Sequence, residues 1–120
     1  MDIKVNRHGV NTKIQYHNQT ESIMREHKFT DRREGYWYRL DSVGDNITLN
    51  ISFPKEDGQQ DELDIAVLDE DFLQPWDYQH LLSKHPDFKP ALEIKDKVET
   101  IIAELTDAGI LSGHETGEYI

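Results

Sequence analysis

The sequence predicts an α+β fold in which an antiparallel β-meander of four to five strands packs on two C-terminal helices. Two observations support this prediction. From residue 36 to residue 68 apolar residues largely alternate with polar ones, and from residue 74 the apolar spacing becomes that of helices. Strands that precede helices in this way are typical of a segregated α+β fold.

The length of 120 residues is close to the commonest size of a single domain. We therefore expect one domain over residues 1–120, with strands mainly in 1–68, helices in 74–109 and a tail in 110–120. Hydrophobic residues make up 36% of the chain, which is enough for a core at this length.

The clearest strand pattern is that of residues 46–53, where Ile47, Leu49, Ile51 and Phe53 alternate with polar residues. Such alternation is typical of a strand with one face on a core and the other toward water. Before it, the segment Val43-Gly44-Asp45 predicts a turn. In total, strands are expected over residues 2–5, 10–17, 36–42, 46–53 and 63–68.

Two prolines mark the expected helix starts, because proline suits the first position of a helix. Pro75 begins a short helix that should stop before Pro86, and Pro90 begins a longer one. The longer helix should end at Gly109, since glycine is favoured just after a helix. Its apolar stripe consists of Leu92, Ile94, Val98, Ile101, Ile102 and Leu105.

Residues 18–35 allow two interpretations. Thr20 before Ile23 indicates the start of one helical turn, whereas the run from Ile23 to Phe29 also fits an edge strand. Residues 31–35 are polar and contain a glycine, so they are expected to form a loop.

The net charge of −11 is unevenly distributed along the chain. Residues 1–60 contain nine basic and nine acidic residues, whereas residues 61–120 contain four basic and fifteen acidic ones. Phosphate binding needs Lys and Arg, so this charge argues against direct binding to nucleic acid. It fits a basic protein partner, and it also fits simple solvation.

The sequence lacks the local signatures of common enzyme and metal sites. The absence of cysteine excludes disulfides, thiolate nucleophiles and iron–sulfur clusters. There is no nucleophile elbow, dinucleotide fingerprint or phosphate-binding loop. No pair has the spacing of zinc ligands among the histidines His8, His17, His27, His80, His85 and His114. We therefore expect no cofactor, no metal and no catalytic residue.

No apolar run is long enough to cross a membrane, and the N-terminus has no apolar segment like that of a signal peptide. Together with the lack of cysteine, these features predict a cytoplasmic protein without membrane contact.

Six acidic residues gather within eleven positions of the chain. The favoured interpretation is solvated strand ends and a helix start, where acidic side chains are stabilising. A divalent metal site and a partner surface are the alternatives, although the spacing does not match a calcium-binding loop. The six are Asp61, Glu62, Asp64, Asp69, Glu70 and Asp71.

The aromatic run around Trp37 lies in a predicted strand, where alternate residues share a face. If Tyr36, Tyr38 and Leu40 face the core, Trp37 and Arg39 lie on the polar face. There they would anchor a protein contact or, less in keeping with the charge, stack on bases. Alternatively, Trp37 is covered by the uncertain segment before it.

The segment VETIIAELTDAGILSG, from Val98 to Gly113, resembles the end of a winged-helix domain. In that family a helix leads through a glycine and two aliphatic residues into the wing. The helix here carries Glu99, Glu104 and Asp107 where a DNA-binding protein would offer Arg or Lys. The resemblance therefore does not imply DNA binding.

These observations favour a small, acidic, non-enzymatic module that binds a protein with a basic surface. A sharper version is a DNA mimic of the kind that bacterial and phage mobile elements encode. An enzyme with a site on the polar sheet face, built from His17, Trp37 and Arg39, is one alternative, and a homo-oligomeric structural protein is another. The predicted partner surface consists of Trp37, Arg39, Asp87, Glu93, Asp96, Glu99, Glu104 and Asp107.

Overall fold

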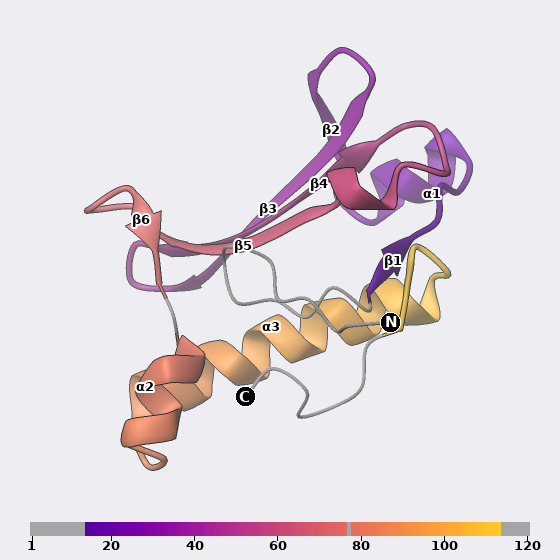
Figure 1. The fold of residues 1–120 in the computed structure, drawn as a ribbon. Coiled ribbons are helices and arrows are strands. Elements are labelled where there is room, and N and C mark those ends of the chain that lie inside the picture. Colours follow the sequence, from indigo (N-terminus) through magenta and orange to yellow (C-terminus); the bar gives the residue numbers. More distant parts are fainter. Residues whose placement is uncertain (1–13, 77, 114–120) are drawn as a thin grey trace.

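The computed structural model describes residues 14–76 and 78–113, and it confirms the predicted α+β fold. An antiparallel sheet has the order β2-β3-β4-β5-β6, which is a meander, and a second sheet pairs β1 with β7 (Figure 1). The strand predicted over residues 2–5 lies outside the described residues, and so does the first part of the strand predicted over residues 10–17. The elements are β1 (Gln15–Tyr16), α1 (Glu21–Glu26), β2 (Thr30–Arg33), β3 (Tyr36–Gly44), β4 (Ile47–Pro54), the 3-10 helix η1 (Gln60–Glu62), β5 (Asp64–Asp69), β6 (Gln74–Pro75), α2 (Tyr78–Lys84), α3 (Lys89–Asp107) and β7 (Leu111–Ser112).

The predicted alternation in β4 is confirmed and explains the position of the core. Its apolar residues are buried and face α3, which runs along one side of the sheet (Figure 1). On either side, β3 and β5 pair with β4 along most of its length. The residues opposite Ile51 are Arg39 and Ile65, and opposite residues in a sheet share a face.

The prediction that Tyr36, Tyr38 and Leu40 face the core is wrong. Trp37 and Arg39 face it instead, whereas Leu40 is exposed on the other side of the sheet. The reason is a shift in the pairing of β3 with β4 between Ser42 and Gly44. A bulge of one residue reverses the face of every residue beyond it.

Residues 18–35 contain both a helix and a strand. Thr20 caps α1, since its side chain accepts a hydrogen bond from the Ile23 amide. The chain then turns at Lys28, and β2 pairs with β3 as an edge strand. The prediction of a polar loop over 31–35 is thus wrong for the residues of β2 and correct for Glu34 and Gly35, which form a turn.

Two C-terminal helices are present, as predicted, but Pro75 does not begin the first. Pro75 belongs to β6, and α2 starts at Tyr78. In α3 the predicted stripe is buried at Ile94, Val98, Ile102 and Leu105, whereas Leu92 is exposed. No helix in the described part of the chain is long and apolar enough to cross a membrane.

Gly109 ends α3, as predicted. Its φ of 76° is left-handed, and the amide of Ile110 donates to the carbonyl of Leu105 at 2.9 Å. This is the capping pattern in which glycine follows the helix and an apolar residue returns to the core. The chain then enters β7, which pairs with β1, so part of the predicted tail is a strand.

Candidate functional site

Two residues of the predicted partner surface lie in the core. Trp37 is 4% exposed and Arg39 is 2% exposed, so neither side chain offers a surface to a partner. The prediction that they lie on the polar sheet face is therefore corrected. The register of β3 against β4, which the residue pattern of β3 alone does not reveal, places them inward.

Arg39 is held by a cluster that joins three parts of the fold. Its guanidinium donates to Asp41 Oδ2 at 2.7 Å, to Glu104 Oε2 at 3.1 Å and to the carbonyl of His27 at 3.1 Å. In addition, His27 Nδ1 lies 2.9 Å from Glu104 Oε2. We call these four residues the Arg39 cluster, which links β3 to α3 and to the end of α1.

The charges of the Arg39 cluster stabilise one another. Burial would lower the pKa of Arg39, but the hydrogen bonds to Asp41 and Glu104 outweigh it and raise the pKa. For the acidic Glu104 burial has the opposite effect and would raise the pKa, but the hydrogen bonds with Arg39 and His27 lower the pKa overall. The cluster is a satisfied structural network, and it leaves Arg39 without a free donor face for a ligand.

Trp37 is covered from the side of residues 18–35, which confirms the alternative interpretation of this residue. The guanidinium of Arg25 in α1 lies 5.4 Å from the centre of the Trp37 ring, and Lys55 Nζ lies 4.3 Å from it. Asp31 forms ion pairs with both cations, and these hydrogen bonds lower the pKa of Asp31. Since Trp37 and Arg39 are both buried, the predicted enzyme site on the polar face is not assembled.

The acidic residues predicted on the helical half lie mostly outward. Asp87, Glu93, Asp96 and Asp107 are exposed, and Glu99 is half-buried. Glu104 is committed to the Arg39 cluster. Glu93 also lines a concave site.

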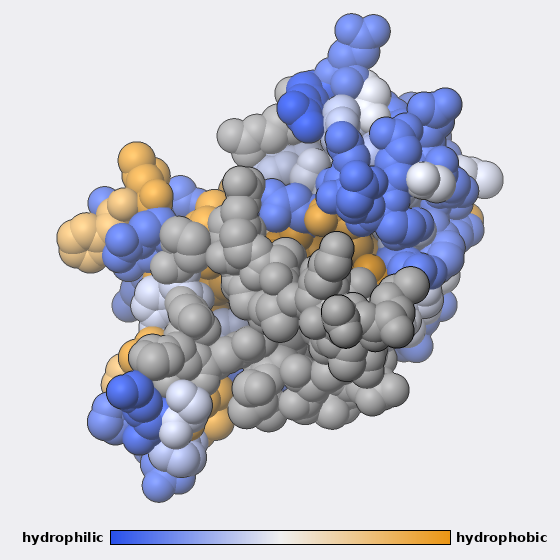
Figure 2. Space-filling model, in the orientation of Figure 1, coloured by the Kyte–Doolittle hydropathy of each residue, from blue (hydrophilic) through white to orange (hydrophobic). Residues whose placement is uncertain are grey.

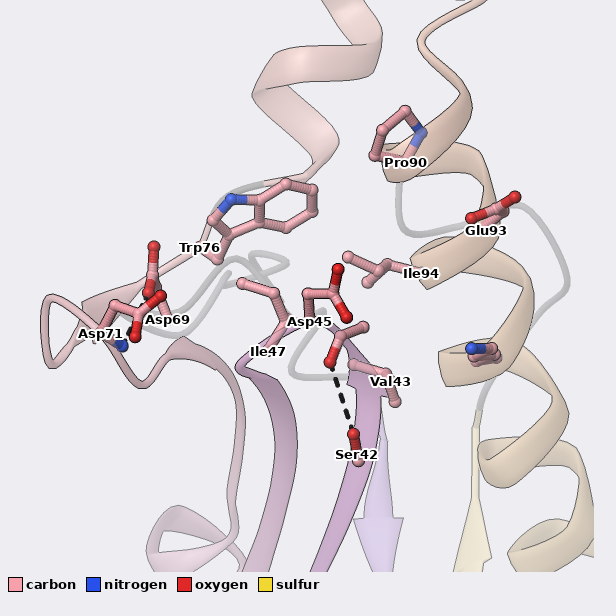
Figure 3. Close-up of a pocket in the computed structure, with 12 residues that line it drawn as sticks. Ser42, Val43, Asp45, Ile47, Asp69, Asp71, Trp76, Pro90, Glu93 and Ile94 are labelled. Carbon is pink, nitrogen blue, oxygen red and sulfur yellow. Dashed lines mark hydrogen bonds between the residues drawn. The ribbon is translucent and has the colours of Figure 1, made fainter.

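That concave site, here called the acidic hollow, lies between the β3–β4 turn, the β5–β6 turn and the first turns of α3. Its volume is about 640 Å³, within the usual range of binding pockets. Asp69 and Asp71 lie on one side, Glu93 lies on the other, and Trp76 and Ile94 lie between them (Figure 3). The remaining lining residues include Val43, Asp45, Ile47, Pro90 and Lys97.

The acidic hollow combines an apolar floor with an excess of negative charge. Four of its residues carry carboxylates, whereas only Lys97 carries a positive charge. The side chains of Asp45 and Glu93 are exposed and form no hydrogen bond or ion pair with the described residues. Such an arrangement favours a cation with an apolar stem, and an indole wall such as that of Trp76 adds a cation–π contact.

No metal site emerges in the part of the chain that the structure describes. No three His, Cys, Asp or Glu residues come together there in a way that could hold an ion. The acidic residues that gather between positions 61 and 71 of the sequence have separate partners: Glu62 is bonded to Tyr36, whereas Glu70 accepts from Thr48 and Asp71 from Asn46. His17 bonds to Ser112 at the β1–β7 pair, away from the acidic hollow.

Sequence reasoning missed Asp45, Trp76 and the exposed apolar pair Phe72-Leu73 beside the acidic hollow. The pair interrupts a polar segment between Glu70 and Gln74, and this was the available signal. Two adjacent large apolar residues cannot both face the core from one strand, because neighbours point to opposite faces.

Comparison with known proteins finds no family model that matches the chain, and no matching curated protein or solved structure. The function is therefore inferred from the geometry described above.

Proposed function

We propose that this protein is a small binding module without catalytic activity, which docks a basic segment of another protein at the acidic hollow. The observation that carries the proposal is the convergence of carboxylates from three separate segments on one apolar floor. A lysine or arginine side chain has the matching chemistry, because its stem is apolar and its end is cationic.

The charge of the chain supports a basic partner in two further ways. The second half of the sequence carries the whole net charge, and long-range attraction accelerates the association of oppositely charged proteins. Because the hollow is open to water, salt should screen the attraction, and the complex should weaken as ionic strength rises.

A matched pair of variants tests the proposal. Asp45→Asn/Glu93→Gln removes two charges from the acidic hollow, and Asp87→Asn/Asp96→Asn removes two exposed charges outside it. We expect affinity capture from the source cells at low salt to recover a basic protein with the wild type. The variant outside the hollow should retain it, and the hollow variant should lose most of it.

Equal recovery by all three proteins would contradict the proposal, because the charges of the acidic hollow would then contribute nothing to binding. An equal loss by both variants would also contradict it, because only the overall charge would then matter. A finer version, in which the outward acidic residues of α3 and of the turn before it imitate nucleic acid phosphates, makes a different prediction. In that case Asp87→Asn/Asp96→Asn would lose the partner, and duplex DNA would compete with the chain for it. A stable oligomer of the chain alone, seen by light scattering, would support the structural alternative.

A further inference from the structure

The apolar pair Phe72-Leu73 lies at the tip of the turn between β5 and β6. Phe72 is 72% exposed and Leu73 is 83% exposed, more than any other large hydrophobic residue that the structure describes. The turn projects from the end of the sheet (Figure 1), and an apolar patch stands out at that end of the surface (Figure 2). Single exposed apolar residues are common, but an adjacent pair on a projecting turn suits insertion into a partner.

Hydrogen bonds hold the turn in shape. Asp69 Oδ1 accepts from the amide of Asp71 at 2.9 Å, and Asn46 Nδ2 donates to both carboxylate oxygens of Asp71 at 3.1 Å. The amide of Glu70 donates to the carbonyl of Asn46 at 2.8 Å. The β5–β6 turn is therefore tied to the β3–β4 turn, and little conformational freedom remains to be lost when a partner binds.

Leu73 has a left-handed backbone with φ of 52°, a conformation that glycine or asparagine adopts more easily. A large apolar side chain thus stands where neither the backbone nor the core requires it.

The charges around the pair define what it fits. Asp69, Glu70 and Asp71 precede Phe72 directly, and the acidic hollow adjoins the turn. A second copy that met this patch with its own would bring like charges together, which is unfavourable. The complementary surface is an apolar slot bordered by lysine or arginine.

We propose that Phe72 and Leu73 are the apolar anchor of the complex and insert into such a slot on the basic partner protein. This inference rests on the proposed function and adds a second contact to it. Apolar anchors at the centre of an interface carry much of its affinity, whereas surrounding charges mainly govern specificity and the rate of association.

Site-specific photo-crosslinking tests the inference. The photoreactive residue p-benzoylphenylalanine replaces Phe72 in one protein and Leu40, an exposed apolar residue on the outer sheet face, in a control. We expect an adduct from position 72 only. Its cross-linked peptide should contain aliphatic or aromatic residues next to Lys or Arg. The inference would be overturned if position 72 gave no more adduct than position 40. It would also be overturned if the adduct joined two copies of the chain.

The partner protein identified from the adduct is then purified, and its affinity for variants of this chain separates the two proposals. Phe72→Ser and Leu73→Ser should each weaken binding about tenfold or more, and Leu40→Ser should leave it unchanged. If Asp45→Asn/Glu93→Gln weakens binding but the serine variants do not, the anchor fails and the proposed function stands. If no variant changes the affinity, both fail. Thermal melting confirms that each variant is folded, which the exposure of the replaced side chains favours.

Discussion

At the scale of single residues, Arg39 connects β3 to α3 and to the end of α1. It is the only buried charged residue among those described, and it contacts Asp41 on its own strand and Glu104 on α3. A buried ion pair adds modest net stability, because desolvation opposes the attraction. Removing one partner is costly, however, since the other charges then remain without compensation.

We therefore expect Arg39→Met to lower the free energy of unfolding by about 2–4 kcal/mol. The value lies toward the lower part of the range for buried pairs because Glu104 is 43% exposed and can be solvated. Urea unfolding measures the effect, and Lys89→Met, at an exposed position of α3 that does not line the acidic hollow, is the control for loss of a charge. A stability equal to that of the wild type would show that the cluster does not hold β3 to α3.

The same cluster predicts a loss of stability in acid. The pKa of Glu104 is lowered in the folded state, so folding favours its ionised form. This contribution is complete above the ordinary glutamate pKa of about 4.3 and is lost as pH falls through the folded-state pKa. Glu104→Gln should therefore be less stable than the wild type at neutral pH, and the difference should shrink as pH falls below the ordinary glutamate pKa and through the lowered one. A difference independent of pH, measured by urea unfolding, would contradict this.

At the scale of elements, the bulge in β3 shows which parts of the structure the sequence could predict. The alternation in β4 and the stripe of α3 follow directly from the spacing of apolar residues, and both were predicted. If the register that pairs Gly44 with Ile47 ran along β3 without the bulge, Leu40 would lie opposite Ile51, on the core side. The extra residue reverses this, and no local pattern in β3 marks it, because both faces carry aromatic residues and the charged ones lie on the core side.

The candidate site depended even more on the tertiary structure. Glu93 was predicted as a surface residue, but the partners that make it part of a concave site come from the β3–β4 and β5–β6 turns. Asp45 and Trp76 are separated from each other in sequence by the strands β4, β5 and β6 and by the 3-10 helix η1. Their proximity follows from the meander, which brings alternate turns to the same end of the sheet.

The end of α3 supplies the element-scale prediction. Gly109→Ala places a Cβ in a left-handed conformation, 3.4 Å from Gln19 Nε2, and should cost about 1–2 kcal/mol. Gly109→Asn should cost less, because asparagine tolerates this conformation better. Chemical denaturation compares the three proteins. An alanine variant as stable as the wild type would mean that the turn into β7 does not require glycine.

At the scale of the whole molecule, charge is the dominant property. A net charge of −11 on a chain of this size means that like charges repel one another in the folded state, and the surplus lies in the second half of the sequence. Only a few exposed ion pairs, such as Arg25 with Asp31, oppose this repulsion among the described residues, and exposed pairs contribute little.

Added salt should therefore stabilise the isolated protein by screening the repulsion. We expect Tm at neutral pH to rise by several degrees as sodium chloride increases from about 20 to about 200 mM. The rise should be smaller for Asp45→Asn/Glu93→Gln, which carries two fewer negative charges. Calorimetry measures both, and a fall in Tm with salt would show that attractive ion pairs dominate instead.

The pairing of β1 with β7 has a consequence for the kinetics of folding. Gln15 lies opposite Ser112, so this contact closes a loop that contains almost all of the described residues. Closing a loop of this length costs about 4 kcal/mol in chain entropy, and the burial of Tyr16 and Leu111 that offsets this cost needs the rest of the core to be in place. The meander and α3 should therefore form first, and the β1–β7 pair should join last and open first. In hydrogen exchange, the amides of this small sheet would then exchange through local opening, before those of β3, β4 and β5.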